Sequence, residues 1–318
     1  MSVAIFVVLA IALLIFVSGG YVFFEACLRQ KEPNWLEEKE VEITPYAKYY
    51  SYILLSDRFL REHGVRDVYV ESEDGLKLHG LWIAAENPKG TIILAHGYRS
   101  TKLVDFGLVF ELYHNLGMNI LAPDQRAHGK SEGKYITFGV KESKDIQSWV
   151  AYHNRRYGDL PVILSGLSMG ASTVLYLADA DLPENVKGII ADCGFTTPRE
   201  IIGSVFRRVT HLPAAIVLWA ADLFARVFAG FRMDEKDTRK TLQGSKLPVL
   251  MVHGTDDGFV PCEMSVQGYE ACRGEKELLL VEGADHGVSF LVDRPRYEEA
   301  VRAFLRKNVE GINELRNH

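Results

Sequence analysis

The chain has 318 residues, of which 47% are hydrophobic and 25% charged, and its formal net charge is −6 at pH 7. These values fall in the ordinary globular range and allow one large core in one or two domains. The acidic balance excludes a global basic field, so we expect no nucleic-acid partner. The four cysteines lack CxxC and zinc-ligand spacing, so we expect no metal. Whether Cys262 and Cys272 pair stays open.

The first predicted element is a membrane-spanning helix. Residues 1–24 contain no charged side chain, and Val3 to Val17 is an unbroken apolar run. A helix of this length spans a hydrocarbon core about 30 Å thick. No Lys or Arg precedes the run, and apolar residues resume after Gly20, so a cleaved signal peptide is the less favoured alternative. We therefore predict a single-pass anchor over residues 1–24.

The segment after the anchor is predicted to be polar and partly helical. Arg29 and Lys31 follow the span while only the α-amino group precedes it, which favours a cytoplasmic location for the following domain. Residues 25–66 are expected to hold a charge-rich linker and then an amphipathic helix. Thr44-Pro45 is typical of a helix start, and the helix should end at about Glu62.

Short apolar strands begin after residue 66. Val68–Val70 and Leu76–Ile83 alternate in polarity around a turn, which predicts a hairpin. Continuous apolar runs then recur, each followed by a helix-length stretch, which indicates a parallel sheet covered on both faces. The runs are 91–95, 119–122, 161–165, 188–191, 248–252 and 277–281. We predict an α/β domain over residues 67–318 with a mostly parallel, eight-stranded sheet.

One connection in this domain is too long for a simple crossover. About fifty residues separate Phe195 from Lys246, where a few would suffice. Within them, Leu212–Phe231 is apolar apart from Asp222 and Arg226. We predict that residues 195–246 form a helical cap beside the strand ends. Its apolar character suits an apolar substrate, a membrane-facing surface or packing on its own domain, and these alternatives stay open.

A serine motif stands between a predicted strand and a predicted helix. Gly166-x-Ser168-x-Gly170 follows the run 161–165, and the helix begins near Met169. A strand that turns sharply into a helix exposes the serine hydroxyl above the sheet, and the flanking glycines avoid clashes. The helix start directs backbone N–H groups toward developing negative charge. The pattern predicts Ser168 as a nucleophile.

A nucleophilic serine needs a base, and the base needs an orienting carboxylate. After a turn of this kind the expected chain order is serine, acid, histidine. His286 follows the last apolar run and is predicted as the base. Asp256 and Asp257 both follow the run 248–252. The pattern alone does not separate these two acids.

These motifs resemble a bacterial α/β-hydrolase family that groups serine aminopeptidases with monoacylglycerol lipases. The matching segments are His96-Gly97-Tyr98, Asp124 to Ser131, Gly166 to Gly170, His253 to Pro261 and Asp285-His286-Gly287. The resemblance implies an α/β-hydrolase fold. It implies Asp257 as the acid, four positions after His253 and four before Pro261. It also implies that the backbone N–H groups of Tyr98 and Met169 form an oxyanion hole.

The resulting expectation is a membrane-anchored serine hydrolase that cleaves a small-molecule acyl ester without a cofactor. The apolar cap and the anchor favour acyl lipids over peptides. A thioesterase, an aminopeptidase-like peptidase and a catalytically silent scaffold remain as alternatives. Arg126 and His128, within the second matching segment, are expected to have structural roles. Nothing in the sequence indicates the oligomeric state.

Overall fold

One eight-stranded sheet forms the centre of the computed structural model, which describes residues 3–42 and 50–312. The strand order is β1-β2-β4-β3-β5-β6-β7-β8. β2 runs antiparallel to both β1 and β4, and the remaining pairs are parallel. The strands are β1 (Arg66–Glu71), β2 (Lys77–Ile83), β3 (Gly90–Ala95), β4 (Met118–Pro123), β5 (Val162–Leu167), β6 (Val186–Asp192), β7 (Val249–Gly254) and β8 (Lys276–Val281). The predicted fold class is confirmed.

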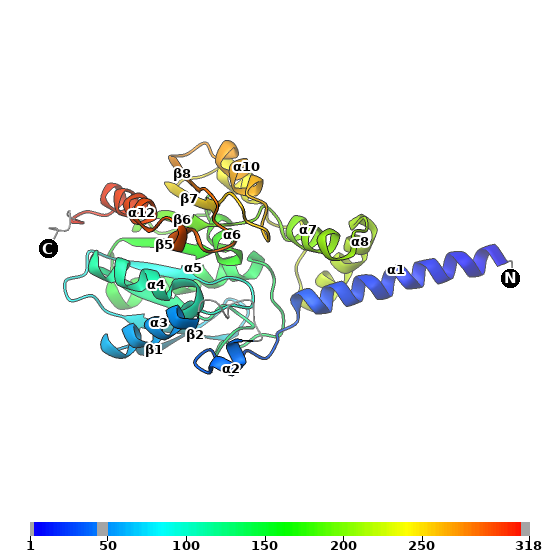
Figure 1. Cartoon of the computed structure of the whole chain (residues 1–318), viewed down its shortest axis with the longest axis horizontal. Helices are drawn as coiled ribbons and strands as arrows, with labels where there is room; N and C mark the ends of the chain where they lie inside the picture. Colours follow the sequence, from blue (N-terminus) through cyan, green and yellow to red (C-terminus); the bar gives the residue numbers. More distant parts are fainter. Residues whose placement is uncertain (1–2, 43–49, 313–318) are drawn as a thin grey trace.

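Helices cover both faces of this sheet (Figure 1). On one face, Phe110 and Phe304 belong to a core shared with α3, and on the other, Trp149 and Val174 pack among strand residues. Because both faces are covered, the parallel strands carry continuous apolar runs, and β3, β4 and β7 are buried along their whole length. The helices are α3 (Tyr50–Glu62), α4 (Lys102–Asn115), α5 (Val140–Tyr157), α6 (Met169–Leu175), α10 (Glu263–Ala271), α11 (Ser289–Val292) and α12 (Arg294–Asn308).

The long connection after β6 is helical. It contains α7 (Pro198–Thr210), α8 (Ala215–Phe224), the π-helix η2 (Ala225–Ala229) and α9 (Thr238–Gln243). Thr197 begins α7, because its side chain accepts a hydrogen bond from the Glu200 N–H and Pro198 occupies the first turn. We call residues Pro198 to Ala229, which hold α7, α8 and η2, the cap. The cap projects from the domain on the side where α1 approaches it (Figure 1).

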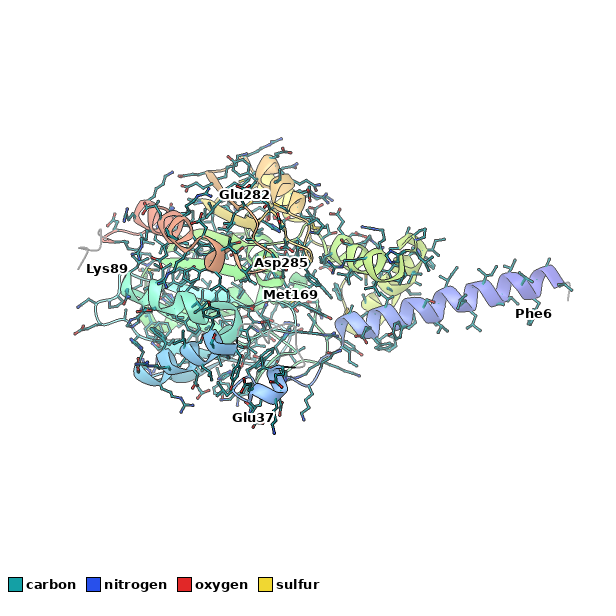
Figure 2. All side chains as sticks on the ribbon, viewed as in Figure 1. Phe6, Glu37, Lys89, Met169, Glu282 and Asp285 are labelled. Atoms are coloured by element: carbon teal, nitrogen blue, oxygen red, sulfur yellow. The ribbon has the colours of Figure 1, made fainter. Side chains whose placement is uncertain are left out.

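The helix α1 (Val3–Cys27) is long and apolar enough to cross a membrane, by length and composition. Its outer part projects away from the domain, with Phe6 near its free end (Figure 2). Its last turns, in contrast, lie against α8, where Gly20, Phe23 and Cys27 are buried. The helix therefore continues three residues past the predicted bound at residue 24.

The segment expected to be a linker is packed on the domain. The Arg29 N–H donates to the Lys134 carbonyl over 2.9 Å, and the Arg29 guanidinium contacts the carbonyls of Gly129 and Ser131. A short helix, α2 (Glu38–Val41), follows. These partners come from residues about 100 positions away, so the local charge pattern could not reveal them. The predicted helix start at Thr44-Pro45 lies outside the described residues.

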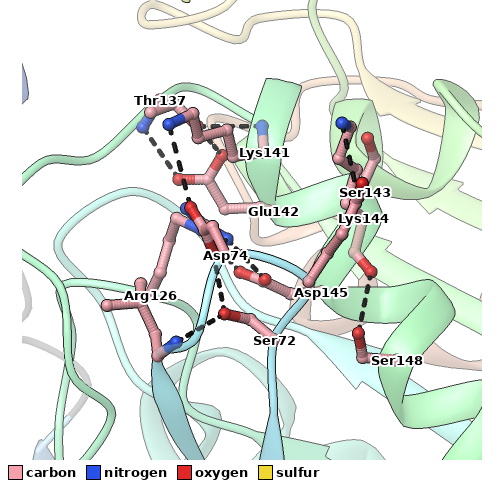
Figure 3. Close-up of polar contacts among 12 residues, drawn as sticks. Ser72, Asp74, Arg126, Thr137, Lys141, Glu142, Ser143, Lys144, Asp145 and Ser148 are labelled. Atoms are coloured by element: carbon pink, nitrogen blue, oxygen red, sulfur yellow. Dashed lines mark hydrogen bonds and ion pairs between the residues drawn. The ribbon is translucent and has the colours of Figure 1, made fainter. Parts of the chain in front are cut away.

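The buried side chain of Arg126 connects the segment after β4 to α5 and to the turn between β1 and β2. Arg126, after β4, makes paired hydrogen bonds of 2.6–2.7 Å to Asp145 on α5 and of 2.9–3.0 Å to Asp74 in the β1–β2 turn (Figure 3). The side chains of Arg126 and Asp145 are each only 5% exposed. Nearby, His128 accepts the Arg99 N–H through Nε2. These contacts agree with the structural roles expected for Arg126 and His128.

Arg126→Met should destabilise the fold strongly. The substitution leaves the Asp145 carboxylate buried without its partner, which costs about 3–5 kcal/mol. Urea unfolding followed by circular dichroism measures the change. The control is Arg58→Met, which removes an exposed ion pair to Glu62 and should leave the unfolding free energy nearly unchanged. Equal effects of the two substitutions would contradict the role given to Arg126.

Candidate active site

Ser168 occupies a strained turn between β5 and α6. Its φ of 55° and ψ of −115° are unfavourable for a residue with a side chain, at a cost of about 1–3 kcal/mol. Backbone crowding enforces the turn. A Cβ on Gly166 would lie 2.1 Å from the Gly170 oxygen, and a Cβ on Gly170 would lie 1.7 Å from the Ala95 oxygen. Only glycine fits at both positions, which explains the motif seen in the sequence.

His286 joins Ser168 to Asp257. Its Nε2 lies 2.9 Å from the Ser168 Oγ, and its Nδ1 lies 2.7 Å from the Asp257 Oδ2. An ionised carboxylate only accepts hydrogen bonds, so Nδ1 donates to Asp257 and Nε2 can accept the serine hydroxyl. Met169, which follows Ser168 in the chain, and Asp285, which precedes His286, are labelled in Figure 2 and locate the site in the domain. The structure thus brings all three predicted side chains into one hydrogen-bonded chain.

The two adjacent aspartates have different surroundings. The Asp257 side chain is fully buried, and its Oδ1 accepts the N–H groups of Phe259 and Val260 at 2.8 Å. Asp256 is exposed and accepts a hydrogen bond from the neighbouring Thr255 hydroxyl. The geometry therefore favours Asp257, as the family resemblance implied.

A second histidine supports the same carboxylate. The His253 Nε2 lies 3.1 Å from both the Asp257 Oδ2 and the Val260 carbonyl, and its Nδ1 faces the Ser265 hydroxyl at 2.6 Å. Burial raises the pKa of Asp257, but the hydrogen bonds from His253 and His286 outweigh it and hold that pKa well below its ordinary value. Asp257 is therefore ionised at neutral pH. The sequence placed His253 at a strand end without revealing this contact.

The loop after β3 closes over the serine. A Cβ on Gly97 would lie 3.4 Å from the Ser168 Cβ, and the Gly97 N–H donates to the buried Asp105 carboxylate. Tyr98 follows in this loop, and its hydroxyl donates to the Ala26 carbonyl of α1 over 2.8 Å. Met169 begins α6, at a position whose N–H has no partner within a helix. Both predicted oxyanion donors thus belong to segments that border Ser168.

A cavity of about 740 Å³ extends from Ser168 and His286. Apolar side chains form one part of its wall, contributed by three separate segments. They are Trp35 from the segment after α1, Ile53 from α3, and Val104, Leu108 and Val109 from α4. Sequence reasoning assigned none of these side chains to the site, because their approach depends on how residues 28–42 and α3 pack relative to α4.

Two further groups lie beside the chain of hydrogen bonds. Asp192 ends β6, and burial raises the pKa of its carboxyl to about 6. Next to it, burial raises the pKa of the Cys193 thiol well above its ordinary value. Across the described ranges, Cys193, Asp257 and His286 form the one group close enough to hold a metal ion. Because Asp257 and His286 already bond each other and the thiol stays protonated, this group is a poor metal site.

Known proteins share this sequence pattern and fold. Residues 86–239 match the family described as "Serine aminopeptidase, S33". The uncharacterized protein YqkD of Bacillus subtilis is 31% identical over 237 residues, which cover 74% of this chain and 77% of YqkD. Alpha/beta hydrolase domain-containing protein 17B of Xenopus tropicalis is 28% identical, over 71% of this chain and 69% of its own. An esterase of Pyrococcus furiosus superposes with a TM-score of 0.63 at 26% identity, over 77% of this chain and 92% of the esterase.

The raised pKa of Asp192 predicts a pH-dependent cost of folding. Its folded pKa of about 6 exceeds the ordinary value of 3.8, so the unfolded chain loses this proton first as pH rises. The free energy of unfolding should therefore decrease as the pH rises from 3.8 to about 6. Asp192→Asn should remove this contribution, so its stability relative to wild type should rise by roughly 2–3 kcal/mol from pH 4 to pH 7.

Urea unfolding at several pH values measures this difference. The substitution also removes the carboxyl hydroxyl of Asp192, but this changes the free energy of unfolding by the same amount at every pH and leaves its slope with pH unchanged. Asp181→Asn is the control, since the Asp181 side chain is fully exposed. Parallel pH profiles for wild type and Asp192→Asn would show that Asp192 is ionised in the folded protein.

Proposed function

The chain belongs to the α/β-hydrolase family, and we propose that it is a membrane-anchored serine hydrolase that cleaves esters of apolar acyl groups. One observation carries this proposal. The hydrogen-bonded chain Ser168–His286–Asp257 lies at the wall of a partly apolar cavity. Membership of the family and the esterase neighbour support a hydrolase, and the site supports the choice of serine chemistry.

In the proposed mechanism, Ser168 attacks the ester carbonyl while His286 Nε2 takes its proton. Asp257 keeps the imidazole oriented and stabilises the imidazolium that forms. The N–H groups of Tyr98 and Met169 stabilise the oxyanion, each contributing about 3–4 kcal/mol. His286 then returns the proton to the leaving alcohol. Water, activated by the same histidine, releases the acid and restores the serine.

The cavity favours an apolar acyl group over a peptide amino terminus. An aminopeptidase needs a carboxylate available to bind the substrate ammonium. Each acidic side chain in this cavity wall already accepts at least one hydrogen bond from the protein itself, which weakens it as a partner for an ammonium group: Glu32 from the Gly129 N–H, Asp105 from Gly97 and Ser100, Asp285 from Gly258 and His286, and Asp192 from Ser289. The wall near α4 presents aliphatic side chains, which suit an acyl chain.

The anchor in this proposal is α1. Its apolar side chains from Val3 to Val17 are mostly exposed, as expected for lipid contact rather than for a core helix. Arg29 and Lys31, just after the helix, favour a cytoplasmic position for the hydrolase domain. Carbonate extraction of membranes and protease protection of the tagged chain test these two assignments separately.

A fluorophosphonate probe should label the wild-type chain at Ser168, and Ser168→Ala should take no label. Asp257→Asn should lower kcat for p-nitrophenyl esters by about 10⁴-fold, because the amide cannot hold the imidazole in its reactive tautomer. Mass spectrometry of the labelled peptide and spectrophotometric turnover are the measurements.

Asp256→Asn is the matched control and should retain wild-type turnover. An intact Ser168→Ala chain that still takes the label would remove Ser168 from the mechanism. Equal losses from the two aspartate substitutions would argue that Asp257 has no special role.

Leu108→Trp should shorten the acyl chains that are accepted, because the indole fills space beside the aliphatic wall. Turnover of long-chain p-nitrophenyl esters should fall about tenfold or more relative to the acetyl ester. The control is Leu55→Trp, on α3, where the side chain is exposed and outside the cavity wall. A uniform loss for all chain lengths would place the acyl group elsewhere.

A further inference from the structure

The inner part of α1 and the cap helix α8 form a tightly packed pair. A Cβ on Gly19 would lie 2.4 Å from the Ala220 Cβ, so the two helices approach as closely as small residues permit. The Phe16 and Phe224 rings, 4.7 Å apart, extend the contact toward the outer part of α1. Close approach at Gly and Ala is typical of helices that associate within lipid.

The end of α1 is fixed to the domain by its last carbonyl groups. Ile136 N–H donates to Cys27 over 2.7 Å, and the Tyr98 hydroxyl donates to Ala26 over 2.8 Å. These bonds satisfy carbonyls that a helix end leaves without intrahelical partners. The helix is therefore not a loose tether, and its direction determines where the cap lies relative to a membrane.

The uncharged part of α1 includes Gly19 and Gly20, which touch α8 of the cap. The 22 residues from Val3 to Phe24 carry no charge and measure about 33 Å as a helix. A hydrocarbon core is about 30 Å thick. Gly19 and Gly20 thus belong to the span, and α8, packed against them, lies at the same depth as the last turns of α1.

The surface of the cap matches this location. Its exposed large apolar side chains, which we call the cap face, are Val209, Leu212, Ile216, Trp219, Leu223, Val227 and Phe228. Four of them follow one stripe of helix at spacings of three, four and four residues. A helix exposed to water would carry polar residues on this stripe.

The one charged residue of α8 points inward. The Asp222 side chain is 4% exposed and pairs with Arg226 and Arg199, while its Oδ1 accepts the Met233 N–H over 2.7 Å. Charge on the helix is thereby neutralised on the side facing the domain. Arg226 is half exposed, and its long side chain can reach a polar interface from a buried helix.

We propose that the cap face inserts into the lipid bilayer beside α1, so that the two form one membrane-embedded unit. The proposal rests on the membrane anchoring proposed above and adds a second lipid-contacting surface. The cavity wall includes Arg208 of α7 and residues Gln30 to Pro33, which begin three residues after the end of α1. Helix α7 of the cap and the segment that follows α1 thus both contribute to the cavity wall beside Ser168.

Tryptophan fluorescence tests the proposal without a label. Of the four tryptophans, Trp219 is 69% exposed, whereas Trp35, Trp82 and Trp149 are buried. The full chain is reconstituted into phosphatidylcholine vesicles with or without bromine on the acyl chains, since bromine quenches a tryptophan that it contacts. Emission should fall by roughly a quarter, the share of one tryptophan in four, and Trp219→Phe should abolish that loss.

Two further variants control for position. In the Trp219→Phe background, Leu223→Trp on the cap face should regain quenching, and Tyr69→Trp on the edge strand β1 should not. Equal quenching of wild type and Trp219→Phe would overturn the proposal, as would burial of the cap face against a second copy of the chain, seen as protection from bromine.

The outcome is separable from the proposed function. Ester turnover in the same vesicles reports the hydrolase chemistry, and resistance to carbonate extraction reports the insertion of α1. A carbonate-resistant, active chain whose Trp219 is not quenched would overturn the cap-face insertion alone. A chain released by carbonate would overturn the anchor and the cap-face insertion together, whatever its turnover.

Discussion

The site depends on the close backbone contact between the turn after β5 and the end of β3. Gly170 lies so near the Ala95 carbonyl that no side chain fits between them. This contact holds Ser168 at a positive φ and brings the Gly97–Tyr98 loop against it. Because parallel strands are in register at this edge, one strained residue can meet groups delivered by β7 and β8. The hydrogen-bonded chain through His286 is a consequence of that packing.

Environment then gives the buried carboxyls different properties. Asp257 has two imidazole partners, which overcome burial and keep it ionised. Asp192, at the end of the neighbouring strand, accepts a hydrogen bond from the Ser289 hydroxyl rather than from an imidazole, and burial raises its pKa to about 6. Asp105 behaves like Asp192, with a pKa raised to about 6 by burial, and it receives the Gly97 N–H. Two acids near one imidazole thus differ because of hydrogen bonding rather than residue type.

The N-terminal segment is part of the site rather than an addition to it. Its helix contacts the cap through Gly19 and the loop after β3 through the Ala26 carbonyl. The residues that follow contribute Trp35 to the cavity wall. In the proposed function α1 is the membrane helix, and its contacts with the cap and with the loop after β3 link the apolar surface of the molecule to the apolar substrate proposed for it.

The sequence by itself determined the fold class, the strand positions and the order of the candidate site residues. These follow from local rules: continuous apolar runs for covered strands, and glycines around a serine for a strained turn. Tertiary structure decided what depends on distant partners. It distinguished Asp257 from Asp256 by burial and by two histidines, one of them 29 positions away. It also brought α1 onto α8 and Trp35 into the cavity, because such contacts arise from the packing of whole elements and leave no periodic trace in the chain.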